Sequence, residues 1–250
     1  MPRRTKSLAA AELVEKSSEW LWTELSKGSN QGQQSWLNAD ATGNSVVAAV
    51  GTQAVRAFVL EDPKCLTEPG DETQKFQVEI GYTTDADRVF LDTMYESAVN
   101  EALGKSWFGK KKLSLDDIRD RIKHPFWAGT AGAEQGVVGS TRLKMVTETT
   151  RASGPVDIYV VTKDDNGEEA WRKGDVSDVR GGQPCVADVK WMGVNVTPLS
   201  ASFMPRITKL MVWESDAPSE LPCGIELRPA KRARTEEAPQ VILRGDEDEQ

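Results

Sequence analysis

Three short segments place aromatic residues beside lysine or arginine. Their residues are Trp107, Phe108, Lys110, Lys111 and Lys112 in the first, Trp171, Arg172 and Lys173 in the second, and Lys190 and Trp191 in the third. A flat aromatic ring can stack on an unpaired base, at about 1–3 kcal/mol per base, and a neighbouring cation can bind the phosphate. This combination indicates a binding site for single-stranded nucleic acid.

Position within strands sorts these candidates further. Arg142 and Lys144 join them because residues two apart in a strand share one face. By the same alternation, the adjacent Lys190 and Trp191 cannot both line one flat surface. The chain has eight Trp, and the core remains the favoured position for any single one of them, with a neighbouring lysine stem lying along apolar surface. Three consecutive lysines, Lys110–Lys112, cannot all be buried.

Catalytic and metal-binding constellations are sparse. The single histidine excludes sites that need two imidazoles, and three widely spaced cysteines exclude a disulfide framework and a Cys-x-x-Cys zinc site. We therefore expect no enzymatic activity, no cofactor and no metal. One alternative stays open: Asp188-Val189-Lys190 with Asp157 faintly resembles a magnesium-dependent nuclease, which would hold the metal between two carboxylates.

Charge divides the chain into two parts. The net charge is −8, and residues 214–250 hold ten acidic and five basic residues, so the preceding 213 residues carry only −3. The 214–250 segment also has four prolines and few aliphatic residues, which predicts a disordered tail. It ends in the acidic block Asp246, Glu247, Asp248 and Glu249. Lys231–Arg234 is either a nuclear-import signal or a chance basic cluster.

The elements that must position the candidate residues are mostly strands. Apolar periodicity predicts helices over 7–26, 85–104 and 114–123, and Gly- and polar-rich loops over 28–44 and 128–139. Alternating or β-branched runs predict strands over 46–50, 55–60, 76–82, 142–145, 156–162, 185–196 and 207–213, with a hairpin turn at 164–167. Nothing alternates as βαβ, so the predicted class is α+β, mainly antiparallel β, with two or three peripheral helices.

One family resembles this order of segments. Trp107 to Ile118 follows an amphipathic helix, and Pro125-Phe126, Ser153 to Tyr159 and the strands of 186–213 come after it. Over about 85–213, this order is similar to the single-stranded DNA-binding proteins of nucleocytoplasmic large DNA viruses. The resemblance implies an OB-like β-barrel, similar to phage replication proteins, that binds displaced single strands in replication and recombination without catalysis. It also implies an acidic tail that recruits partner proteins and competes with nucleic acid.

These observations define one expected organisation. Residues 1–213 form a single OB-like domain, with a helical segment over 1–28, and 214–250 form the tail. The expected partners are single-stranded DNA, with RNA as an alternative, and replication or recombination proteins held by the tail, with no membrane; a homodimer is left open. The absence of a signal peptide predicts an intracellular protein, in the nucleus or at a viral replication site. A virion- or chromatin-associated scaffold, with a tail that only increases solubility, is the alternative function.

Overall fold

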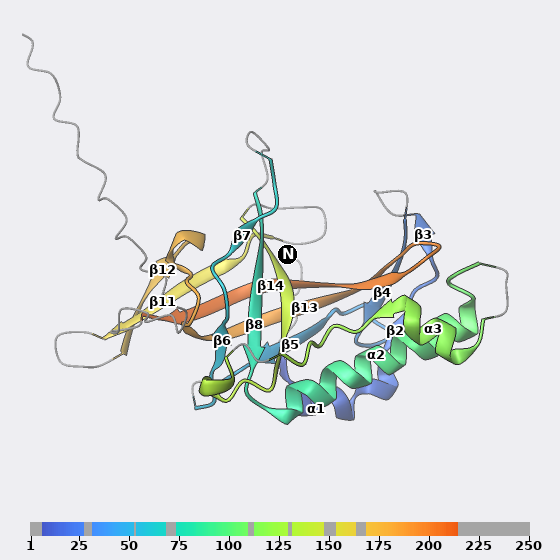
Figure 1. Cartoon of the computed structure of the whole chain (residues 1–250), viewed down its shortest axis with the longest axis horizontal. Coiled ribbons are helices and arrows are strands. Elements are labelled where there is room, and N and C mark those ends of the chain that lie inside the picture. The colour runs from blue at the N-terminus through green and yellow to red at the C-terminus, as the bar shows by residue number, and fades with distance from the viewer. Residues whose placement is uncertain are drawn as a thin grey trace, which may run out of the picture. The chain divides into compact units, whose positions relative to one another are not determined.

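The computed structural model describes residues 7–27, 32–52, 54–68, 74–109, 113–129, 132–147, 154–163 and 169–214, all within one compact unit, Met1–Asp216. The α-helices of these ranges are α1 (Ala10–Glu15), α2 (Asp85–Lys105) and α3 (Leu115–Arg121). The strands are β1 (Leu8–Ala9), β2 (Leu21–Trp22), β3 (Ser26–Lys27), β4 (Gln33–Asn38), β5 (Val46–Val50), β6 (Ala57–Val59), β7 (Lys64–Cys65), β8 (Lys75–Tyr82), β9 (Ile122–Lys123), β10 (Gly139–Val146), β11 (Asp157–Lys163), β12 (Glu169–Gly174), β13 (Pro184–Val196) and β14 (Ala201–Trp213) (Figure 1). The predicted α+β class, dominated by strands, is confirmed.

Two long strands, β13 and β14, form the spine of the sheet. They pair antiparallel from Cys185–Val212 to Val196–Ala201, with two irregularities in register that increase their twist. At the second irregularity Gly193 has φ 129°, and a Cβ there would lie 2.1 Å from the carbonyl oxygen of Ser35 in β4. Only glycine tolerates this backbone and this close approach of β4.

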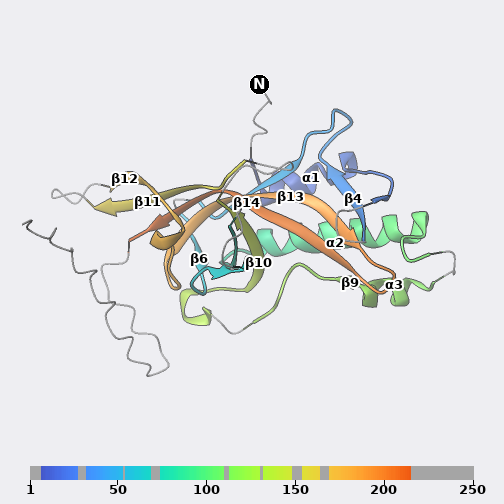
Figure 2. The same ribbon diagram turned by 90° about the horizontal axis from the view of Figure 1, so that it is seen from above.

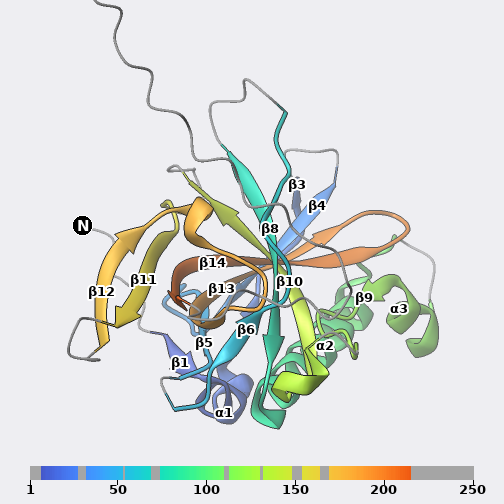
Figure 3. The ribbon, with the colours of Figure 1, turned by 60° about the vertical axis from the view of Figure 1, so that its left-hand side comes forward.

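Five strands pair in a closed circuit. Strand β13 pairs with β6, β6 with β8, β8 with β10, β10 with β14, and β14 with β13. Four of these pairings are antiparallel, and β10–β14 is a parallel contact registered at Lys144 and Arg206. Outside the circuit, β5 and β4 also pair with β13, while β11 and then β12 extend the sheet from β14 (Figure 3).

The helices and the core lie on the same side of β13. Phe90, Leu91 and Met94 of α2 are buried in one cluster with core residues of the circuit, and the Phe90 ring meets the Trp191 ring at 6.0 Å and 72°. Figure 1 shows α1 and α2 together along one side of β13 and β14, and in Figure 2, from above, the two strands cross over α2. The long helix begins where Thr84 Oγ1 accepts a hydrogen bond from the Asp87 amide (3.3 Å) and ends at Ser106 in the left-handed region. The predicted helix over 85–104 is confirmed.

The N-terminal predictions are partly wrong. Of the helix predicted over 7–26, only α1 is α-helical; Leu21–Trp22 instead pairs with β4, which lies inside the loop predicted over 28–44. Strand β4 is polar in composition, but Ser35 and Leu37 are buried because β4 also pairs with the distant β13. Short-range periodicity cannot show such a partner.

Other predicted elements are confirmed with small shifts. Helix α3 begins at the predicted cap, where Ser114 and Asp117 form a reciprocal capping box, but Ile122 and Lys123 pair with β14 instead of extending the helix. Strands β11 and β12 pair antiparallel, and the turn predicted at 164–167 between them lies outside the described residues. No helix of the described ranges is long and apolar enough to cross a membrane.

Candidate nucleic-acid interface

The sheet has an outer face, which we define as the side of β8, β10, β13 and β14 that points away from the core. Strand β10 shows the alternation clearly: Leu143 and Met145 are buried, while Arg142 and Lys144 are exposed. Alternation therefore carries both predicted cations to the outer face, as their spacing indicates.

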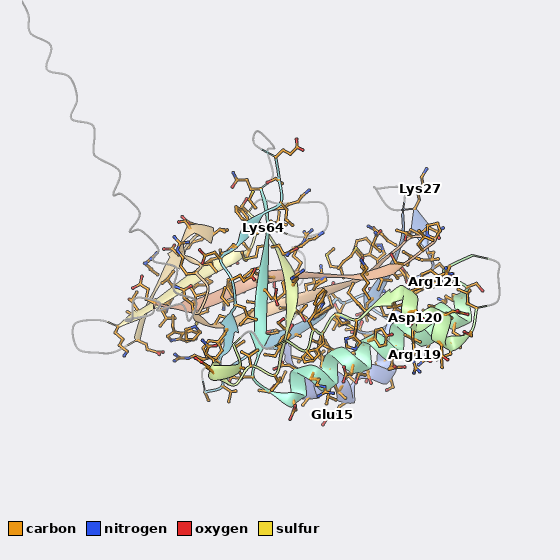
Figure 4. All side chains as sticks on the ribbon, in the orientation of Figure 1. Glu15, Lys27, Lys64, Arg119, Asp120 and Arg121 are labelled. Atoms are coloured by element: carbon orange, nitrogen blue, oxygen red, sulfur yellow. The ribbon has the colours of Figure 1, made fainter. Side chains whose placement is uncertain are left out.

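Strand register brings further cations into line with Lys144. Residues directly opposite one another in a sheet share a face, and here Lys190 pairs with Arg206, Arg206 with Lys144, Lys144 with Gln77, and Gln77 with Lys64. We call Lys190, Arg206, Lys144 and Lys64 the cationic row. It crosses five strands, which at about 4.8 Å per strand corresponds to about 19 Å. Figure 4 shows its last member, Lys64, beside β8.

Two members of the row are partly removed from water. Lys190 and Arg206 are half-buried; burial lowers the pKa of both, and the positive charge of Arg206 lowers the pKa of Lys190 further. Within the described part of the chain, no carboxylate forms an ion pair with Lys190 or Lys144. Lys190 is partly desolvated beside a second cation, and a bound anion would offset the repulsion between the two positive charges.

A cavity of about 140 Å³ opens beside the row. It combines polar or charged side chains with an apolar wall, and its lining residues are Gln77, Arg142, Lys144, Met192, Phe203, Met204, Pro205 and Arg206. Because a nucleotide has both a charged phosphate and a flat apolar base, this mixture suits it better than a purely charged patch would.

An exposed tryptophan adjoins the same residues. Trp127 is 56% exposed, and the Arg142 guanidinium carbon lies 4.9 Å from the centre of its ring. The backbone of Trp127 exchanges hydrogen bonds of 2.9 Å with that of Ser140, and the Arg142 side chain is held by Glu79, to whose Oε2 its Nε donates at 3.1 Å. Trp127 therefore presents an aromatic surface to solvent beside a cation.

A second aromatic group lies where β11 and β12 leave the circuit. Trp171 is 68% exposed and meets Tyr159 edge to face at 5.4 Å, while Lys209 Nζ is 5.4 Å from the Tyr159 ring. Lys173 lies opposite Tyr159 in register. Tyr159 also pairs with the outward-pointing Met211 of β14, so this hairpin cluster (Tyr159, Trp171, Lys173 and Lys209) belongs to the outer face.

Two predicted stacking residues are wrong. Trp107 is 3% exposed, within a cluster formed by α2, α3 and the end of the β13–β14 hairpin, and Trp191 is 1% exposed against Phe90. Both fill the core, so neither ring can receive a base. Phe108 is half-buried near α3, with the Arg121 guanidinium 5.5 Å from its ring, and the structure does not bring it to the cationic row.

Arg172 is also corrected as a phosphate candidate. Alternation along β12 turns it to the opposite face from Trp171 and Lys173. Its guanidinium forms ion pairs with Asp178 (2.8 Å) and Glu214 (3.3 Å), and the hydrogen bond to Asp178 raises the pKa of Arg172 while lowering the pKa of Asp178. The charge of Arg172 is therefore already neutralised.

Some predicted site residues lie outside the described residues. They are Lys110, Lys111 and Lys112 and the tail block Asp246, Glu247, Asp248 and Glu249. The remaining predicted cations are found as follows: Arg142, Lys144 and Lys190 come together on the outer face, and Lys173 joins the hairpin cluster.

The two carboxylates of the nuclease alternative lie on either side of a lysine. In register, Asp188 and Asp157 lie on opposite sides of Lys209, one strand away on each side. Among the side chains that the structure describes, no group of three or more His, Cys, Asp or Glu is placed to hold a metal ion. This arrangement gives the two carboxylates a lysine as their shared neighbour.

Sequence reasoning missed several outer-face residues: Lys64, Gln77, Trp127, Tyr159, Arg206 and Lys209. The sequence could have indicated Arg206, because this residue directly precedes the strand predicted over 207–213. Trp127 has no such signal, since its cationic neighbour is brought to it by the pairing with Ser140.

The chain has detectable similarity to known proteins only at the level of three-dimensional structure. No family model and no curated protein matches the sequence. Among solved structures, the chain is similar to gp2.5, a single-stranded DNA-binding protein encoded by bacteriophage T7, with a TM-score of 0.39 and 11% identity, over 69% of this chain and 88% of that chain. It is similar to the single-stranded DNA-binding protein from bacteriophage Enc34 (TM-score 0.39, 12% identity, 79% of this chain and 93% of that chain), and to that protein in complex with ssDNA (TM-score 0.38, 12% identity, 78% and 97%).

Likenesses at these TM-scores do not establish a common fold or a common function. The resemblance to the viral family has no sequence match behind it and stays a prediction. The function proposed for this chain therefore depends on its own outer face.

Proposed function

We propose that this chain is a non-catalytic single-stranded DNA-binding protein of replication or recombination, and that it binds through the outer face. The observation that carries the proposal is the cationic row beside Trp127 and Arg142. Lys190 and Lys144 lie next to Arg206 with no ion-paired carboxylate among the described residues, and an exposed indole lies next to Arg142. Phosphates bind the row, and an unpaired base stacks on the indole.

The overall charge makes a local site necessary. A chain of net charge −8 does not attract DNA through its whole surface, so affinity must come from a restricted cationic region together with stacking. The row provides the first and Trp127 the second. Trp171 and Lys173 of the hairpin cluster provide a second contact on the same face.

Exposed rings favour a single strand over a duplex. A paired and stacked base has no free face, whereas each base of a single strand can stack on an aromatic side chain. RNA presents the same phosphates and base faces and remains the alternative ligand.

The proposal includes an OB-like barrel. An OB-fold is a five-stranded, partly open barrel that binds oligonucleotides on its outer surface and loops. The support is the closed circuit of five strands, whose outward side carries the cationic row.

The acidic tail and Lys110–Lys112 complete the proposal. Asp246–Glu249, tethered to the domain, competes with DNA for the cationic row at an effective concentration of order mM, and bound DNA releases it to recruit replication or recombination proteins. Lys110–Lys112 adds phosphate contacts. The support for these parts is the charge of the sequence.

Fluorescence anisotropy tests the proposal. Full-length protein is titrated into labelled oligo(dT), oligo(rU) and a duplex, at low and at moderate salt. We expect oligo(dT) to bind more tightly than the duplex, with an affinity that falls as salt rises. Equal or tighter binding of the duplex refutes the single-strand assignment, preference for oligo(rU) moves it to RNA, and no binding to any of the three favours the scaffold alternative.

A further inference from the structure

Strand β12 is an open edge of the sheet. Within the described ranges it pairs only with β11, and Figure 3 shows it as the outermost strand on that side. Every residue from Glu169 to Lys173 is exposed, including the 68% exposed indole of Trp171. An exposed edge strand presents unpaired backbone amides and carbonyls and can pair with another chain.

We infer that the partner for this edge is a second copy of the chain, which docks by antiparallel pairing of β12 with β12. Trp171 lies on the two-fold axis in this arrangement. Glu169 then lies opposite Lys173 of the second copy, and Ala170 lies opposite its Arg172. The two outward indoles lie side by side on one face of the joined sheet.

The charges along β12 favour both a second copy as the partner and one register of the β12–β12 pair. The strand reads Glu-Ala-Trp-Arg-Lys, so only a copy reversed about Trp171 places each acidic end against a basic end, and it does so twice. A register shifted by two residues in one direction sets Arg172 against the other Arg172, and a shift in the other direction sets Glu169 against Trp171. Like charges directly opposite destabilise a strand pair, so the Trp171-centred register is favoured.

Side-chain size agrees with this register, and the existing contacts of the charged side chains restrict how they meet. Ala170 and Arg172 share the face opposite to Trp171, and the small Ala170 leaves room for the long stem of the facing arginine. Asp178 and Glu214 already neutralise the Arg172 guanidinium, so no unpaired cation is buried there. Glu169 Oε1 is already engaged by Arg56 Nη2 at 3.0 Å and by the Trp213 indole nitrogen at 2.9 Å, so the second copy's Lys173 must approach the other carboxylate oxygen, Oε2. The Lys173 ammonium has no ion pair with any described residue.

The geometry has a consequence for ligand binding that depends on the proposed function. A two-fold axis perpendicular to the joined sheet places both outer faces on the same side. The cationic rows of the two copies then belong to one surface, with the paired Trp171 rings between them, and a single strand can pass from one copy to the next.

Self-association of the full-length protein, measured without nucleic acid, tests the inference. Because no DNA is present, failure to dimerise is distinguishable from failure of the proposed DNA binding. Sedimentation velocity over a concentration series should show a monomer–dimer equilibrium with Kd on the order of micromolar, as expected for a short interface. Lys173→Glu converts both cross-strand attractions into repulsions and should weaken dimerisation on the order of tenfold. Lys16→Glu, the same charge change at an exposed position outside the sheet, should leave it unchanged.

A charge-swap mixture gives the decisive result. Glu169→Lys and Lys173→Glu should each dimerise poorly alone, but an equimolar mixture should form heterodimers because both contacts again join opposite charges. If Glu169→Lys loses its fold, seen as a lowered Tm, Lys173→Glu against Lys16→Glu still decides the matter. Two results would overturn the inference. One is a protein that stays monomeric up to about 100 μM, and the other is equal dimerisation of Lys173→Glu and wild type.

Discussion

Replacing Lys144 and Lys190 by glutamine should reduce the salt dependence of oligo(dT) binding by a predictable amount. These two lysines of the cationic row point to the outer face, and neither forms an ion pair with a described carboxylate, so each is available to a phosphate. Glutamine removes the charge while keeping a flexible polar side chain that is one atom shorter. The fold should tolerate the change, because the half-buried Lys190 ammonium is disfavoured by burial and by Arg206.

The magnitude follows from counterion release. For single strands, each neutralised phosphate contributes about −0.7 to the slope of log K against log salt. Losing one contact makes the slope shallower by about 0.7, and losing both by about 1.4. Between about 50 and about 200 mM salt, the double variant should therefore lose about sevenfold less affinity than wild type, and each single variant about 2.6-fold less.

The assay is fluorescence anisotropy of labelled oligo(dT) at several salt concentrations. The matched control is Lys16→Gln, an exposed lysine directly after α1, on the side away from the outer face. Its slope should equal that of wild type. Equal slopes for wild type and the Lys144→Gln/Lys190→Gln variant, or an equal loss in the Lys16→Gln control, would refute the assignment of phosphate contacts to the row.

Three further predictions concern individual side chains. Trp127→Leu should weaken oligo(dT) binding by about 1–3 kcal/mol and remove part of the fluorescence quenching while leaving Tm unchanged; undiminished quenching would contradict stacking on this ring. Trp191→Ala should lower the free energy of unfolding by about 3–5 kcal/mol, measured by urea denaturation, because the 1% exposed ring fills the core against Phe90, and a loss below 1 kcal/mol would contradict that position. Burial and Arg206 lower the pKa of Lys190 below its ordinary value of 10.5, so the lysine loses its charge at a lower pH than usual. Affinity for oligo(dT), measured over a pH series, should fall as pH rises through that pKa, and Lys190→Arg should flatten the decline.

Local signals in the sequence predicted the elements whose partners are near or whose caps are explicit. Helix α2 follows from its apolar stripe, and α3 from the Ser114–Asp117 capping box. The spacing of Arg142 and Lys144 placed both on one exposed face, because alternation depends only on the strand itself.

The rest depends on contacts between distant segments. Adjacency to a cation favoured Trp191 as a stacking residue, but strand alternation sends Lys190 outward and Trp191 into the core beneath α2. Trp127 is near no cation that the sequence singled out, yet its pairing with Ser140 places it beside Arg142. Composition likewise could not reveal β4, whose burial comes from its pairing with β13.

Photo-crosslinking tests the central claim, binding of single strands on the outer face, most directly. Full-length protein is bound to oligo(dT) containing 5-iododeoxyuridine, irradiated, digested and analysed by mass spectrometry. We expect crosslinks at Trp127 and at Tyr159 or Trp171, and their loss when unlabelled oligo(dT) competes. Crosslinks confined to the half-buried Trp22 and other residues of the α1–α2 side would contradict the account.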